Sequence, residues 1–155
     1  MRKLVLLAAI LGFFSVTAAF GQNQAPALNF CGLDIPVSAG CTAASSYELR
    51  CTDYSLRWAY LNYAQMGAAA EEAARVVKKD HKKAEQEPLV GFILDMPAKG
   101  YRLSYPTEAT GMAYEIILYG VAKGQPVVVQ LTMGVAPEKT TDLPEVARRI
   151  LRLDR

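Results

Sequence analysis

The hydrophobic pattern of this chain changes its period at Pro88, and that change constrains the fold more than any other feature. Before it, the alanine-rich segment 68–87 repeats apolar residues at helical spacing and contains no helix breaker. Its last turns are crowded with lysines, which suit the negative end of a helix dipole. After Pro88, apolar and polar residues alternate with the period of two that a half-buried strand requires. The sequence therefore predicts one long helix followed by antiparallel strands.

The strands of the second half are separated by residues that favour turns. Turns are expected where proline and glycine collect, at 97–100, 106–111 and 123–125. These turns divide the region into four strand segments, at 89–94, 101–105, 114–121 and 127–133.

Strand patterns also occur before the helix. Residues 33–37 alternate as a short edge strand does. Residues 54–60 alternate with a parity opposite to that of 47–51, which predicts a strand that follows a bend or bulge at Thr52-Asp53. A helix over 54–65 is the alternative, because the apolar residues there also share one helical face.

The C-terminal segment carries a second helix signal. Asp142 and Glu145 are spaced as a capping box, and Pro144 suits the first helical turn. The apolar residues that follow form one stripe at helical spacing. A short helix is therefore expected over 143–153.

Together these elements predict an α+β domain. It would hold an antiparallel sheet of about five strands, with the long alanine-rich helix packed on it and the short C-terminal helix closing an edge or face. The segment from Gly100 to Pro106, GYRLSYP, is similar to the Gly-aromatic-x-apolar-x-Tyr-Pro entry strand of the PsbP/Mog1-like α/β sandwich. Extended hairpins followed by a short capped helix also resemble that fold. The resemblance implies a fold and no functional residue.

The N-terminal residues have the pattern of an export signal. Arg2 and Lys3 precede an apolar run, and small residues at Ala19 and Gly21 suit a signal peptidase. We expect residues 1–21 to be a signal peptide, 22–30 a leader, and 31–155 a single domain. An uncleaved anchor is the alternative. The expected location is therefore secreted or periplasmic, with no membrane span in the mature chain.

Three cysteines follow at equal spacing, and an exported chain can oxidise them. One intramolecular bond leaves one thiol over. We expect the bond to join Cys31 and Cys41, where it would contribute about 3 kcal/mol in the chain-entropy model. Cys51 is then expected to be a buried thiol. The spacing is not that of a zinc site, so no metal or cofactor is expected.

Charge and motifs narrow the function classes. The net charge is +2, and loss of Arg2 and Lys3 with the signal would leave the chain near neutral, which argues against nucleic acid as a partner. The sequence contains no nucleophile elbow, P-loop or HExxH motif. His81 is expected to be a solvated residue of a lysine-rich helix end, and no catalytic residue is assigned.

The aromatic residues Tyr54, Trp58, Tyr60 and Tyr63 allow two interpretations. At strand spacing they are core residues, whereas on an open face they would stack on a carbohydrate or peptide. We therefore expect an exported, non-catalytic binding or accessory module for a protein, peptide or carbohydrate. The alternatives are a small exported hydrolase or a thiol enzyme that uses Cys51, and a structural envelope protein.

Overall fold

The computed structural model describes residues 27–109 and 111–154. The expected signal peptide, and residues 22–26 of the expected leader, lie outside them. The strands are β1 (Ala27–Phe30), β2 (Leu33–Pro36), β3 (Cys41–Ser45), β4 (Glu48–Cys51), β5 (Tyr54–Tyr60), β6 (Glu85–Ile93), β7 (Met96–Thr107), β8 (Gly111–Ala122), β9 (Gln125–Met133) and β10 (Leu151–Leu153). The helices are η1 (Tyr63–Gln65), α1 (Met66–Asp80), η2 (Thr140–Asp142) and α2 (Glu145–Arg148).

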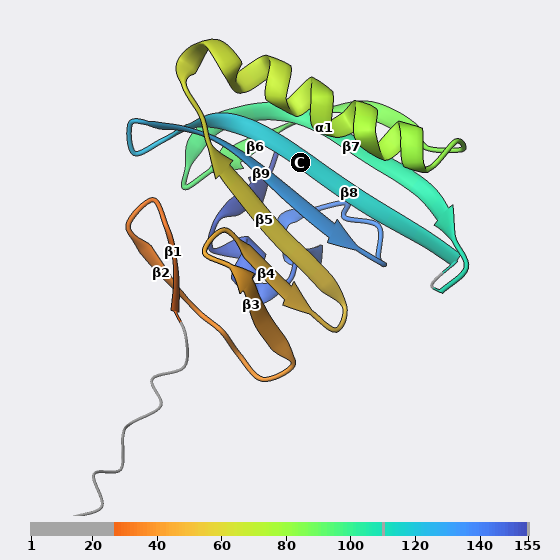
Figure 1. The fold of residues 1–155 in the computed structure, drawn as a ribbon, viewed down its shortest axis with the longest axis horizontal. Helices are drawn as coiled ribbons and strands as arrows, with labels where there is room; N and C mark the ends of the chain where they lie inside the picture. Colours follow the sequence, from red (N-terminus) through yellow and green to blue (C-terminus); the bar gives the residue numbers. More distant parts are fainter. Residues whose placement is uncertain (1–26, 110, 155) are drawn as a thin grey trace, which may run out of the picture.

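Eight of these strands form one curled antiparallel sheet in the order β10-β6-β7-β8-β9-β5-β4-β3, and β1 and β2 form a separate hairpin. Figure 1 shows α1 lying across the sheet, with the β1–β2 hairpin beside β3 and β4. Strand β1 occupies the last four residues of the segment expected to be a leader.

The expected α+β domain with about five strands is wrong, because the structure is 54% strand and mostly β. The PsbP/Mog1-like sandwich was part of that expectation and is not supported. Residues 41–45 are one source of the error. This segment is rich in Ser, Thr and Ala, so it has no apolar alternation, yet it pairs with β4 as one of the two edge strands of the sheet.

Helix α1 ends at Asp80, seven residues before the predicted end. At His81 the backbone leaves the helical region, and the His81 N–H donates to the carbonyl of Val77 at 2.8 Å. Residues 85–87 belong to β6, which continues through Pro88. The proline is tolerated because β10 pairs only with residues 91–93, so the outer edge of β6 needs no donor at Pro88.

The turn between β6 and β7 also differs from the prediction. It lies at Leu94 and Asp95, both with positive φ, whereas the predicted turn at 97–100 is part of β7. Gly100 instead lies where the backbones of β7 and β8 approach too closely for a side chain, since a Cβ atom there would lie 1.9 Å from the carbonyl oxygen of Ile117. The predicted turn at Lys123 and Gly124 is confirmed, with φ of 48° and 79°.

The C-terminal helix is shorter than predicted. Helix α2 ends at Arg148, and β10 then pairs with β6. The Asp142 carboxylate does not cap α2. Its Oδ2 atom accepts hydrogen bonds from the backbone N–H groups of Glu138 and Lys139, each at 3.0 Å, and so caps η2.

The predicted strand at 54–60 is confirmed as β5, with Leu56 and Trp58 buried. The bend at Thr52-Asp53 is present as the β4–β5 turn. The edge strand expected at 33–37 corresponds to β2.

The sheet is covered on both faces. Residues from α1 pack on one face, where the buried cluster comprises Ala70, Ala74, Val77, Leu103, Tyr105, Ala113 and Ile117. The β1–β2 hairpin and the segment 143–153 cover the other face with a larger apolar core. In β8, which lies between these two covering layers, the consecutive residues Ile116, Ile117 and Leu118 are all buried, as in a central strand with both faces covered.

We predict that Gly100→Ala lowers the free energy of unfolding by at least about 2 kcal/mol, because the β7–β8 ladder must open to admit the methyl group. The control is Gly67→Ala in α1, where the nearest atom to the new Cβ is the Tyr119 hydroxyl at 3.8 Å. This control should be neutral or stabilising by up to about 1 kcal/mol. Urea unfolding of both variants is the measurement, and equal effects would contradict the prediction.

Candidate functional site

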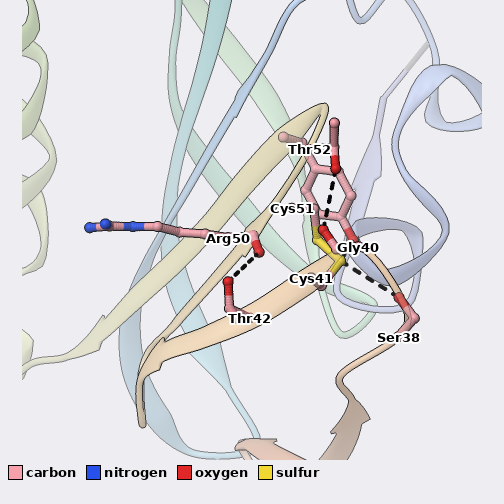
Figure 2. Close-up of a disulfide and its surroundings, with 8 residues drawn as sticks. Ser38, Gly40, Cys41, Thr42, Arg50, Cys51 and Thr52 are labelled. Atoms are coloured by element: carbon pink, nitrogen blue, oxygen red, sulfur yellow. Dashed lines mark hydrogen bonds between the residues drawn. A yellow bond between two sulfur atoms is a disulfide. The ribbon is translucent and has the colours of Figure 1, made fainter.

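The cysteine pairing differs from the prediction. Cys41 bonds to Cys51 (Figure 2), whereas Cys31 is free. The two bonded residues are direct partners in the β3–β4 register, with their Cα atoms 4.0 Å apart. Cys31 lies in the β1–β2 turn on a different hairpin. The expected Cys31–Cys41 bond is therefore wrong, because strand register decides the pairing and sequence spacing does not.

This pairing bears on the thiol-enzyme alternative. With the bond intact, Cys51 has no thiolate to offer as a nucleophile. The remaining thiol, Cys31, is half-buried, and burial raises its pKa despite a hydrogen bond with Tyr60 and the charge of Lys123. A raised pKa disfavours the reactive thiolate.

The four candidate aromatic residues do not lie on one open face. Trp58 is 4% exposed and packs edge-on against Phe30, with ring centroids 5.5 Å apart. Tyr54 is half-buried. The Tyr60 hydroxyl accepts a hydrogen bond from the Cys31 N–H at 2.8 Å. Tyr63 is 63% exposed, and its hydroxyl donates to the Gly124 carbonyl. Trp58 therefore belongs to the core, and binding of a carbohydrate or peptide by the other aromatic residues stays a prediction.

His81 lies at the end of α1 with its ring stacked on Tyr105, at a centroid distance of 3.8 Å. Within residues 27–109 and 111–154, no group of three or more His, Cys, Asp and Glu side chains could hold a metal ion. In the same part of the chain, no helix is long and apolar enough to cross a membrane.

A buried polar cluster, which the sequence analysis missed, lies on the face of the sheet that α1 covers. Glu115 of β8 is 4% exposed, and the Tyr105 hydroxyl donates to its Oε2 atom at 3.3 Å. Gln130 of β9 is 7% exposed, and its Oε1 atom accepts from Arg57 Nε at 2.6 Å. Gln130 Nε2 has no partner among the described residues. The sequence signal for this cluster was one polar residue inside each of two apolar strands, Glu115 in β8 and Gln130 in β9.

The electrostatics of this cluster follow from its burial. Desolvation raises the pKa of Glu115, and the Arg57 charge and the Tyr105 hydrogen bond oppose that shift only in part. Desolvation and the neighbouring Glu115 carboxyl raise the pKa of Tyr105 to about 12. Because Glu115 is closed off from solvent, we interpret the cluster as a structural feature rather than a reaction centre.

An apolar hollow of about 500 Å³ lies on the same face, beside the first residue of α1. Four separate segments form it, from α1, β6, β7 and β8, which is why no sequence motif marks it. Its lining residues are Met66, Val90, Met96, Pro97, Ala98, Lys99, Tyr119, Gly120 and Val121. We call this feature the apolar hollow.

Large apolar side chains of the apolar hollow are open to solvent. Val90 is 58% exposed and Met96 is 48% exposed. Lys99 lies at the hollow with its Nζ atom 5.9 Å from the centroid of the Tyr119 ring, a cation–π contact. The site therefore combines apolar surface with one ammonium group.

Comparisons with known proteins add no assignment to this geometry. No protein-family model matches the chain, and no curated protein matches it. The functional argument therefore rests on the hollows and side chains of the structure.

We predict that the Cys41→Ser/Cys51→Ser variant loses about 2–3 kcal/mol of unfolding free energy, because the bond closes a loop between residues separated by 10 positions. Cys31→Ser is the control and keeps the bond. Peptide mapping without reduction should link Cys41 to Cys51. A map that links Cys31 to either partner would contradict the pairing.

We predict that Glu115→Gln flattens the pH dependence of stability. Because burial raises the folded-state pKa, Glu115 favours folding most at pH values below its unfolded pKa of about 4.3. That contribution declines as the pH rises towards the folded pKa. Glutamine keeps an acceptor for Tyr105 and removes the titration, so the variant should lose less stability than the wild type between about pH 4 and pH 7.

The control for this prediction is Glu71→Gln, which removes the same charge from an exposed position of α1. Urea unfolding across the pH range is the measurement. If both variants change the pH slope equally, the burial argument for Glu115 is wrong.

Proposed function

We propose that this protein is an exported, non-catalytic binding module whose apolar hollow takes a small amphiphilic anion. The apolar part of the ligand enters the hollow, and its acid group lies at Lys99. The observation that carries the proposal is the lining, in which Lys99 is the one charged side chain among otherwise apolar and small residues.

The size of the apolar hollow supports a small ligand. At about 500 Å³ it falls in the range of about 300–1,000 Å³ that small-molecule sites occupy. Burial of about five methylene groups would contribute about 4 kcal/mol before the entropic cost of association. A medium-chain carboxylate is therefore the simplest ligand that fits both the volume and the charge.

Export is supported by the disulfide and by the sequence pattern. A bond such as Cys41–Cys51 persists in oxidising compartments outside the cytoplasm. The signal-like pattern of residues 1–21 lies outside the described residues and is consistent with the same location.

The test is a displacement titration with anilinonaphthalene sulfonate as the bound probe and decanoate as the competitor. We expect Val90→Thr to weaken decanoate binding about fivefold, because a hydroxyl replaces a methyl group in the apolar lining. The matched control is Val135→Thr, at a residue that is 65% exposed and does not line the apolar hollow. This control should leave binding unchanged.

The role of Lys99 is tested separately. Lys99→Met keeps an apolar side chain of similar length and removes the charge. It should weaken binding of decanoate about tenfold and leave binding of decanol unchanged. If decanoate does not bind, or if it binds the Val90→Thr and Val135→Thr variants equally, the proposed function is wrong. Concentration-dependent self-association without decanoate binding would favour the structural alternative.

A further inference from the structure

A second hollow, of about 290 Å³, lies where the β6–β7 turn, the β8–β9 turn and the segment after α2 meet. We call it the basic hollow. Its lining residues are Leu94, Asp95, Lys123, Thr140, Arg148, Arg149, Ile150, Leu151 and Arg152. The basic hollow and the apolar hollow have no lining residue in common.

The basic hollow concentrates positive charge in a chain whose net charge is only +2. Lys123 and three arginines line it, against the single carboxylate of Asp95. Asp95 is highly exposed, and its Oδ1 atom lies 3.6 Å from Arg152 Nε. Solvent screens such a pair, so Asp95 offsets only part of the local charge.

Two of the arginines are held in place by contacts that leave other N–H donors available. Arg149 donates one hydrogen bond from Nη2 to the carbonyl of Asp34 at 3.3 Å. The Arg152 guanidinium lies 3.8 Å from the centroid of the Phe92 ring. A guanidinium has five N–H donors, and its planar fork matches the oxygens of a phosphate group.

The backbone around the basic hollow is also fixed. The Leu94 N–H donates to the carbonyl of Ile150 at 2.8 Å, which ties the β6–β7 turn to the segment after α2. The Thr140 hydroxyl accepts from the Leu153 N–H at 2.9 Å. The cationic side chains therefore extend from a preformed frame, which lowers the entropic cost of binding an anion.

We propose that the basic hollow binds a phosphate ester, through the guanidinium groups and the Lys123 ammonium. A phosphate ester carries one or two negative charges that offset this excess of cations, and its oxygens accept several charge-assisted hydrogen bonds at once. The ester is either a free phosphomonoester or the headgroup of an anionic phospholipid. The proposal does not depend on the function assigned to the apolar hollow.

The first arm of the test titrates the protein with glycerol phosphate at constant ionic strength, followed by calorimetry and by amide chemical shifts. We compare the wild type with Lys123→Asn/Arg148→Gln. Asparagine suits position 123 because it tolerates the positive φ of 48° there. The matched control is Lys78→Gln/Lys79→Gln, which removes two exposed charges from the last turn of α1.

We expect the basic-hollow variant to bind glycerol phosphate at least about tenfold more weakly, and the α1 variant to bind it within about twofold of the wild type. The shifted amides should belong to residues 94–95, 123 and 148–152. Thermal unfolding of each variant establishes that it is folded. Equal weakening in both variants would show general charge attraction and overturn the site.

The second arm measures co-sedimentation with phosphatidylglycerol vesicles, with phosphatidylcholine vesicles as the neutral reference. Vesicle binding that is lost in Lys123→Asn/Arg148→Gln and retained in the α1 variant supports the lipid headgroup as the source. Binding of glycerol phosphate without vesicle binding supports a free phosphomonoester. If neither probe binds, the proposal is wrong, and the decanoate titration still tests the apolar hollow independently.

Discussion

Burial of the central strands on both faces is the constraint on which the rest of the structure depends. In β8, Ile116, Ile117 and Leu118 are all buried, so neither face of the sheet centre can be left to solvent. Helix α1 covers one face, and the β1–β2 hairpin with the segment 143–153 covers the other. The ladder itself is tight, since Gly100 has no room for a Cβ atom against Ile117.

Both proposed sites lie where the elements that cover the sheet end. The sheet extends past the first residue of α1, and the uncovered end holds the exposed side chains of Val90 and Met96. The turns that close β6–β7 and β8–β9 meet the end of α2, where Lys123 and the C-terminal arginines collect around the basic hollow. The core thus fixes the frames of both hollows, while their lining side chains remain open to a ligand.

The candidate sites could not be predicted from the sequence, because residues far apart in the chain form them. Met66 and Val121 both line the apolar hollow. Asp95 and Arg149 both line the basic hollow. The aromatic residues that stood out in the sequence are divided instead between core and surface, with Trp58 buried and Tyr63 exposed. Local alternation identifies a strand, but it does not say which other strands or helices cover each face.

Local pattern determined the elements that depend on neighbouring residues alone. The presence of an alanine-rich helix before Pro88 (though not its end at Asp80), the alternating strand at 54–60 and the turn at Lys123 and Gly124 all follow from side-chain periodicity and backbone preference. Only the tertiary structure decided the eight-stranded sheet, the Cys41–Cys51 bond and the two hollows. These features depend on strand register and on long-range packing, and neither is encoded in the spacing of residues along one segment.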